Sequence, residues 1–245
     1  MQNKVWFTAD IHLHHLSIMY FRPKRREAAG ITLEELKELE REKELGRNDI
    51  SMREKWEAHK ENILNRYDSW MIDKWNNTIK KHDIVYILGD LCLGNRDVTE
   101  ILLRKLNGKK YLVIGNHDKS CRGLENYFEW TGSIKEAKFS NEQFPFIRPE
   151  ETFCVEMCHY PLMAWNRRTH GTCHLHGHVH GAIDALNEAE KELRVDVGID
   201  SKIANLGFVD LETVYNYFEK IRKSENCETY QDYAEWLMAK QGFRM

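Results

Sequence analysis

The chain has 245 residues, of which 42% are hydrophobic and 31% are charged. This length and apolar content are enough to bury a core without disulfide staples, and they exclude an intrinsically disordered chain. The 36 Lys and Arg residues against 39 Asp and Glu residues give a net charge of −3. That balance argues against a strongly basic nucleic-acid-binding surface but leaves a local basic patch open.

Cysteine usage and the first residues point to a cytoplasmic protein. The six cysteines form no Cys-x-x-Cys pair and are too few for a disulfide scaffold, so we expect reduced thiols. The N-terminal residues run directly into a strand-like stretch, without the charged and then apolar pattern of a signal peptide. No run of about 18 apolar residues is present, so we expect no membrane-spanning segment.

Short apolar runs and longer amphipathic stretches alternate along the chain. Runs rich in Val, Ile, Tyr and Phe predict six buried strands, at residues 5–9, 84–88, 111–114, 153–157, 174–176 and 193–197. Apolar residues at helical spacing predict helices within 56–80 and 98–106, and C-terminal helices at about 210–241. Strands that alternate with helices indicate an α/β fold, and we expect residues 1–245 to form one domain.

Residues 22–60 differ from the rest of the chain in their charge. Eleven basic and ten acidic side chains nearly cancel in this segment, and few large apolar residues accompany them. Such a composition is typical of a solvated surface helix with ion pairs between successive turns. The segment follows the first cluster of polar residues directly, so an alternative is a cap over a functional site.

Polar residues able to bind metal follow five of the predicted strands. They are Asp10 and His12 after the first strand, Asp90 after the second, Asn116, His117 and Asp118 after the third, His159 after the fourth, and His178 and His180 after the fifth. In open α/β sheets, ligands bind beyond the carboxyl ends of the strands, so these side chains are expected to converge. The glycines before Asp90, Asn116 and His178 suit tight turns that lift a side chain out of the strand.

The spacing of two pairs of these residues predicts which side chains share a face. Asp10 and His12 are two residues apart, so in an extended backbone both side chains would point the same way, and the same holds for His178 and His180. At this point the residues leave other ligands open, because two further histidines, at 174 and 176, precede His178 in the same alternation.

Carboxylate, amide and imidazole donors without thiolate suit Mn²⁺, Fe²⁺, Ni²⁺ or Zn²⁺. The ligands are too many for one tetrahedral ion, but they fit two ions that share a carboxylate. Two metals about 3.5–4 Å apart form a known clamp for phosphoryl transfer.

The ordered set Asp-x-His, Gly-Asp, Gly-Asn-His-Asp, His and Gly-His-x-His resembles the calcineurin-like metallophosphoesterase superfamily. The resemblance runs from residue 5 to about residue 180. It is tighter to a short bacterial and phage branch of predicted phosphoesterases, through KKYLVIGNHD at 109–118, HYPL at 159–162 and WN at 165–166. The fold that it implies is a four-layer αββα sandwich of two mixed β-sheets, with a dimetal site at the loop ends.

The resemblance implies a role for each motif residue. One divalent ion would be held by Asp10, His12 and His180, the other by Asn116, His159 and His178, and Asp90 would bridge them. The resemblance also implies that His117 faces the substrate as a general acid or charge stabiliser, oriented by Asp118. The favoured metal is Mn²⁺, with Fe, Ni or Zn as alternatives.

The chain departs from the family pattern in three places. The second motif reads GDLCLG where many members have G-D-x-x-D-R, which argues against a phosphoserine or phosphothreonine phosphatase. The third motif ends in Asp118 where Glu is common, and the 22–60 segment has no counterpart. Near the motifs, His15, Arg167 and Arg168 are candidate substrate contacts, although a surface histidine and a solvated basic turn explain them as well.

The expected function is a metal-dependent phosphohydrolase in which a metal-bridging hydroxide attacks a phosphate ester. A site charge of about +1 and no extra arginine clamp favour a phosphodiester substrate. The alternative is a phosphomonoesterase acting on a small metabolite or nucleotide, and a nucleotide or cyclic nucleotide fits either activity. Two other classes are a catalytically silent metal-binding interaction module and a nuclease, for which the net acidity gives no electrostatic support. No oligomeric state is predicted.

Overall fold

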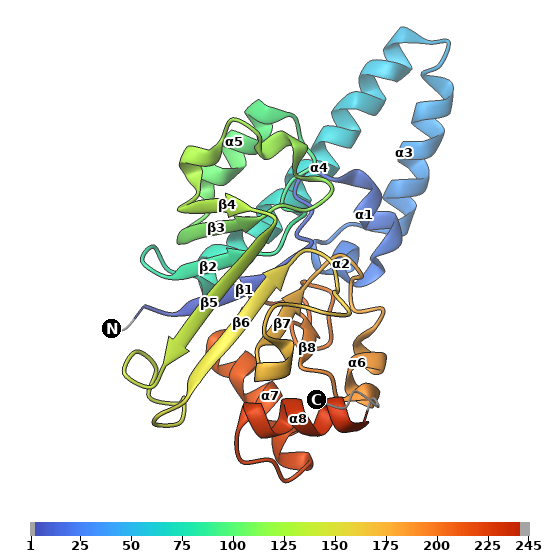
Figure 1. The fold of residues 1–245 in the computed structure, drawn as a ribbon. Coiled ribbons are helices and arrows are strands. Elements are labelled where there is room, and N and C mark those ends of the chain that lie inside the picture. Colours follow the sequence, from blue (N-terminus) through green and yellow to red (C-terminus); the bar gives the residue numbers. More distant parts are fainter. Residues whose placement is uncertain (1–2, 241–245) are drawn as a thin grey trace.

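Nine strands form two sheets in the computed structural model, which describes residues 3–240 (Figure 1). The five-stranded sheet has the order β4 (Trp130–Gly132), β3 (Lys109–Val113), β2 (Ile84–Ile87), β1 (Val5–Thr8), β9 (Val209–Asp210). The four-stranded sheet has the order β5 (Ile134–Ser140), β6 (Thr152–Cys158), β7 (Cys173–His176), β8 (Arg194–Asp196).

Both sheets are mixed, which confirms the predicted α/β fold of two mixed sheets. Strands β1 to β4 run parallel, and β9 pairs antiparallel with β1. In the second sheet β5 is antiparallel to β6, whereas β6, β7 and β8 are parallel. The sequence analysis found six of these strands and missed β4, β5 and β9. Strand β9 has two residues and β5 carries one buried side chain, so neither gives a clear apolar pattern.

The inner faces of the two sheets pack against each other. Phe7 of β1 stacks on Tyr86 of β2 and meets Phe139 of β5 edge to face, with ring centroids 5.5 and 6.4 Å apart. Val155 of β6 and Leu175 of β7 are buried in the same cluster. This contact fixes the two sheets relative to each other, and with them the loops that follow their strands.

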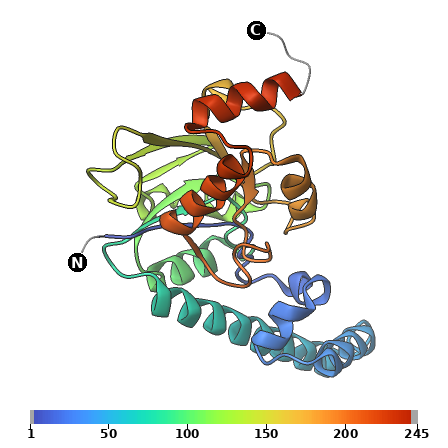
Figure 2. The same ribbon diagram turned by 90° about the horizontal axis from the view of Figure 1, so that it is seen from below.

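Helices cover the outer face of the five-stranded sheet. The C-terminal part of α4 (Ile50–Thr78) and α5 (Arg96–Lys105) lie on this face (Figure 2). Trp75 and Leu102 of these helices share a buried cluster with Trp6 and Val85. Helix α4 begins six residues before the predicted helix at 56–80, because the Asp49 side chain accepts a hydrogen bond from the backbone N–H of Met52.

The outer face of the four-stranded sheet is covered by shorter segments. Helix α6 (Asp184–Glu190) is tied to β8 through Arg194, and the β6–β7 connection lays Trp165 on the ring of His174. Helices α7 (Leu211–Ser224) and α8 (Tyr230–Lys240) lie where C-terminal helices were expected, and residue 241 lies outside the described residues. That the whole chain forms one domain stays a prediction.

The charged segment contains α2 (Pro23–Ala28), α3 (Leu33–Leu45) and the start of α4, and it follows α1 (Leu16–Phe21). Helices α3 and α4 form a hairpin that projects from the body of the fold (Figure 1). Inside the hairpin, the buried Glu42 carboxylate pairs with Lys55 at 2.9 Å and His59 at 2.8 Å. On its surface, Arg41 pairs with Glu38 at 3.0 Å and Lys60 with Glu57 at 2.5 Å, each one turn apart, as the solvated-helix interpretation expects. Helix α2 packs elsewhere, beside the loops described below.

Candidate metal centre

The structure brings together all seven predicted metal ligands. Asp10, His12 and His180 form one group and Asp90, His159 and His178 a second, and the ligand atoms within each group lie within 4.8 Å of one another. Asn116 joins the second group, with its Oδ1 atom 3.0 Å from Nε2 of His159.

Asp90 lies between the two groups. Its Oδ2 atom is 3.8 Å from Nε2 of His12 in the first group and 3.6 Å from Nε2 of His159 in the second. Its other oxygen, Oδ1, accepts a hydrogen bond from the backbone N–H of His117 at 2.9 Å. The carboxylate is therefore placed where a bridge between two cations would lie.

The backbone at these ligands differs from the extended conformation that we expected. Strand β1 ends at Thr8, and Asp10 and His12 have φ of 57° and 53°. His178 and His180 have φ of 70° and 52°. Left-handed backbone costs a non-glycine residue free energy, and such strain is concentrated at functional sites. The members of each pair are thus separated by an intervening residue in a strained loop, and not by the alternation of a strand.

The glycines before the ligands allow close approach of neighbouring segments. Gly89 has φ of 89°, and a Cβ atom there would lie 2.4 Å from Nδ1 of His159. At Gly177 a Cβ atom would lie 2.6 Å from Oδ2 of Asp10. Tight turns were expected at both positions. Gly89 makes one with left-handed backbone, whereas Gly177 is required by the space that the Asp10 carboxylate occupies.

Hydrogen bonds fix the orientation of two candidate histidine ligands. Nδ1 of His159 lies 2.7 Å from the carbonyl oxygen of Leu88, and Nδ1 of His180 lies 2.7 Å from Oδ2 of Asp200. A carbonyl or carboxylate oxygen can only accept, so Nδ1 carries the proton in the neutral form of each ring, and Nε2 then holds the lone pair. In both rings the free lone pair is on the side of the ligand group, as in metal-binding histidines.

Burial at the centre affects His12 and Asp10, both by leaving a polar atom without a partner and by shifting pKa values. Nε2 of His12 is buried and has no hydrogen-bond partner among the described residues. Burial lowers the pKa of His12, which favours the neutral imidazole that ligates metal. Burial also raises the pKa of Asp10, and the nearby carboxylates of Asp196 and Asp90 raise it further. A cation placed among these groups would reverse that effect.

These observations show that the residues fit divalent cations. Carboxylate, amide and imidazole groups converge on two positions, one around Asp10, His12 and His180 and one around Asp90, Asn116, His159 and His178. The donor set contains oxygen and nitrogen but no sulfur, which suits Mn²⁺, Fe²⁺, Ni²⁺ or Zn²⁺. All six cysteines are free thiols, and none belongs to either ligand group.

His117 and His15 lie beside the ligand groups without belonging to them. The exposed ring of His117 is 5.7 Å from the ring of His12 and 6.1 Å from that of His15, measured between centroids. Nδ1 of His15 is 3.2 Å from Nδ1 of His12, and burial lowers the pKa of His15 to about 4. Both side chains are therefore placed to meet a molecule bound at the centre.

Asp118 has different partners from those that the resemblance implied. Its buried carboxylate accepts three backbone hydrogen bonds, from Asp90 at 2.9 Å, Leu91 at 2.8 Å and Gly115 at 2.7 Å. It therefore ties the loop after β2 to the loop after β3. Through these bonds it positions Asp90, and no hydrogen bond to the His117 ring is among them.

We expect Asp118→Asn to lower the free energy of unfolding by about 2 kcal/mol, because the amide group must face at least one of the three backbone N–H groups and leave it unsatisfied. Urea denaturation followed by circular dichroism measures this change. The matched control is Asp73→Asn, an exposed acidic residue on α4, which should unfold as the wild type does. Equal stabilities for the two variants would contradict the assigned role.

The structure does not bring Arg168 to the metal centre. Arg168 pairs with Glu192 at 3.0 Å and covers the ring of Trp165. With Arg167, it lies before the start of β7, towards the amino ends of β6 and β7, whereas the ligands follow the carboxyl ends. The expectation that Arg168 reaches a phosphate at the centre therefore needs correction. Its proximity to the motifs in sequence did not show at which end of β7 it lies.

Three residues around the centre were missed by the sequence analysis. Asp200 binds His180, Asp196 accepts hydrogen bonds from the backbone of Gly181 and Gly198, and Arg25 binds Asp200. Asp200 follows the predicted strand at 193–197, so the rule used for the other strands could have found it, whereas Asp196 lies within that predicted strand. Arg25 carried no such signal, because it is one of eleven basic residues in the charged segment.

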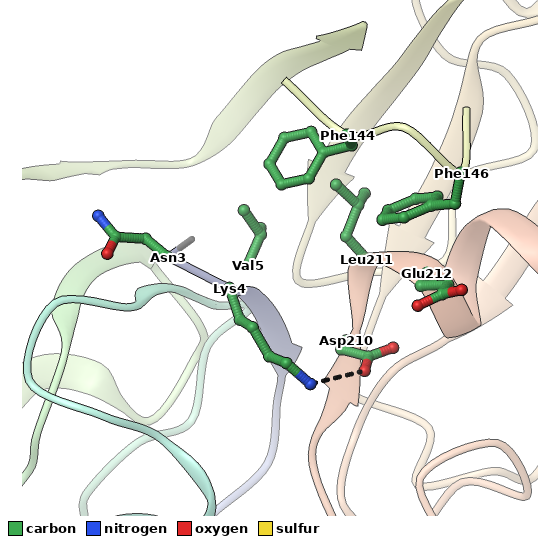
Figure 3. Close-up of a pocket in the computed structure, with 8 residues that line it drawn as sticks. All are labelled: Asn3, Lys4, Val5, Phe144, Phe146, Asp210, Leu211 and Glu212. Carbon is green, nitrogen blue, oxygen red and sulfur yellow. Dashed lines mark ion pairs between the residues drawn. The ribbon is translucent and has the colours of Figure 1, made fainter. Parts of the chain in front are cut away.

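A cavity of about 220 Å³ lies elsewhere in the fold (Figure 3). It is bounded by the start of β1, by Phe144 and Phe146, and by Asp210, Leu211 and Glu212 where β9 leads into α7. The candidate ligands follow the other end of β1, so this cavity is separate from the metal centre.

A two-sheet α/β fold with carboxylate, amide and imidazole groups gathered at its loop ends places the protein among those suited to bind metal ions at such loops. The family model of the calcineurin-like phosphoesterases matches residues 3–197, and the chain belongs to this family. The family depends on divalent metal ions. Its recognition from the motifs is thereby confirmed.

One solved structure supports the fold. It is the crystal structure of a protein of unknown function from Aquifex aeolicus, AQ665, which aligns over 88% of this chain and 100% of its own with a TM-score of 0.54 and 16% identity. A search of curated proteins gave no match. In residues 3–240, no helix has the length and apolar character needed to cross a membrane.

Proposed function

We propose that the protein is a hydrolase that uses two divalent metal ions, Mn²⁺ favoured, to cleave phosphodiesters. The proposal depends on one observation, the convergence of two ligand groups on either side of Asp90. Asp10, His12 and His180 would hold one ion, Asn116, His159 and His178 the other, and Asp90 both. The free thiols agree with the cytoplasmic location that forms part of the proposal.

Two ions held there would supply Lewis-acid stabilisation of the phosphate and a water acidic enough to attack phosphorus. The chain's own residues orient the metal ligands and supply a proton to the leaving group. His159 and His180 present their Nε2 lone pairs because Leu88 and Asp200 hold the opposite ring nitrogens. His117 is exposed beside both groups, where a protonated imidazole can donate to the leaving oxygen of the substrate.

The charge around the centre favours a diester over a monoester. A phosphodiester carries one negative charge, whereas a monoester carries up to two and is usually held by an additional cation. The cation that acts on Asp10, His12 and His15 is Arg25, which is fully buried and paired with Asp200. The partly exposed Arg22 pairs with the same carboxylate at 3.3 Å, so Asp200 engages both guanidinium groups. A phosphomonoesterase remains the second candidate, because the same metal ligands serve both reactions.

A protein that binds metal ions but catalyses no reaction is the alternative to an enzyme, and assays of hydrolysis with and without a chelator distinguish the two. We expect the protein to hydrolyse bis-p-nitrophenyl phosphate faster than p-nitrophenyl phosphate. EDTA should abolish turnover, because the attacking water and the phosphate both need the ions, and Mn²⁺ should restore it. Release of p-nitrophenol measures the rates. Metal binding without turnover of either ester would show the silent module, and faster hydrolysis of the monoester would show the phosphatase.

A further inference from the structure

The guanidinium of Arg25, in helix α2 of the charged segment, is fully buried beside the metal centre. Its Nε and Nη2 atoms donate to the two oxygens of Asp200, each at 2.7 Å. Two parallel bonds of this kind match the planar fork of arginine to a carboxylate and fix the orientation of both groups. The Asp200 carboxylate is thereby prevented from rotating.

The fixed Asp200 carboxylate in turn holds a candidate metal ligand, His180. Its Oδ2 atom accepts a hydrogen bond from Nδ1 of His180 at 2.7 Å, and Nε2 of the same ring is 3.9 Å from Oδ1 of Asp10. A fixed carboxylate behind a histidine sets its tautomer and ring orientation and increases its affinity for metal. Arg25 therefore determines, through one intermediate, where the His180 lone pair points.

Arg25 also holds the opposite side of the same ligand group. Its Nη1 atom donates to the carbonyl oxygen of Ile11 at 3.2 Å and contacts the Tyr67 hydroxyl at 3.2 Å, and that hydroxyl donates to the same carbonyl at 2.8 Å. Ile11 lies between Asp10 and His12, whose left-handed backbone is costly and needs external support.

The second group is supported by other residues. His159 is held by the carbonyl of Leu88, and the Asp90 loop is held by Asp118. Arg25 donates to Asp200, to the Ile11 carbonyl and to the Tyr67 hydroxyl, and none of these bonds reaches a ligand of the second group. One buried cation thus touches both sides of the first group and no member of the second.

We propose that Arg25 is a positioning residue for the metal held by Asp10, His12 and His180, and that the charged segment is fixed to the fold at α2 to supply it. The inference rests on the proposed function, because it assumes that this group binds a metal ion. In this interpretation α2 of the charged segment supports the metal centre, whereas the α3–α4 hairpin projects into solvent.

The test measures binding of Mn²⁺ by calorimetry in the full chain. Arg25→Met should weaken one of two bound ions by about 10–100-fold and leave the other unchanged. Anomalous scattering from Mn²⁺ in crystals should show the weakened position at His180. The matched control is Arg26→Met, the neighbouring buried arginine of α2, which bonds to Glu27 and should bind both ions as the wild type does.

Two further variants keep the inference testable if Arg25→Met does not fold. Arg25→Lys retains the charge but loses the fork, and Asp200→Asn retains the volume but removes the charged acceptor, so both should weaken the same ion. Unchanged affinity for both ions in a folded variant would overturn the inference, and so would equal weakening of both, which would indicate a general effect on the fold. Failure of the wild type to bind Mn²⁺ would instead contradict the proposed function.

Discussion

Replacing Asp90 with asparagine is expected to reduce the bound metal from two ions to one or fewer and to lower turnover by at least about 10³-fold. The carboxylate lies between the two ligand groups, 3.8 Å from Nε2 of His12 and 3.6 Å from Nε2 of His159. Two divalent cations held about 3.5–4 Å apart repel each other strongly. A shared negative charge offsets this repulsion, and an amide of the same shape does not.

Elemental analysis after gel filtration measures the metal content of Asp90→Asn, and hydrolysis of bis-p-nitrophenyl phosphate measures its turnover. The control is Asp97→Asn, an exposed acidic residue of α5, for which both quantities should equal those of the wild type. Circular dichroism checks that the variant folds. Normal content of two ions in folded Asp90→Asn would show that Asp90 does not bridge the two positions.

The convergence of the candidate ligands could be predicted from the sequence because it follows from topology. Strands β1, β2 and β3 are parallel, as are β6 and β7, so the polar residues after them meet at one edge of each sheet. Packing of the two sheets then brings the Asp10 loop to the His178 loop, where the backbone N–H of His178 donates to Asp10 at 2.9 Å. A short polar motif after an apolar run marked each contributor as a candidate, and the resemblance to the family separated the ligands from His174 and His176.

The conformation and support of the ligands could not be predicted in the same way. Left-handed backbone at Asp10 and His12 arises from the pairing of this loop with the loop after β2, where His12 donates to the Asp90 carbonyl at 2.9 Å. That contact joins residues nearly eighty positions apart. Likewise, Arg25 and Asp200 meet across 175 positions. Local patterns of charge and hydrophobicity contain no information about such contacts, so Arg25 could not be distinguished from the other basic residues of the charged segment.

Replacing His117 with alanine should leave both metal ions bound and lower turnover by about 10²–10⁴-fold, the range for loss of a general acid. His117 belongs to neither ligand group, and its contact with Asp90 is made by the backbone N–H, which alanine retains. The loss should be largest for diesters with poor leaving groups, because a leaving oxygen of high pKa needs a proton as its bond to phosphorus breaks.

A series of aryl phosphodiesters with leaving groups of increasing pKa separates this role from metal binding. For His117→Ala, the logarithm of turnover should fall more steeply with leaving-group pKa than for the wild type. His82→Ala, an exposed histidine before β2, should reproduce the wild-type slope. Parallel slopes would assign His117 to stabilisation of charge on the phosphate, since that charge develops whichever group leaves. Loss of metal from His117→Ala would place its imidazole among the ligands and remove it as the proton donor.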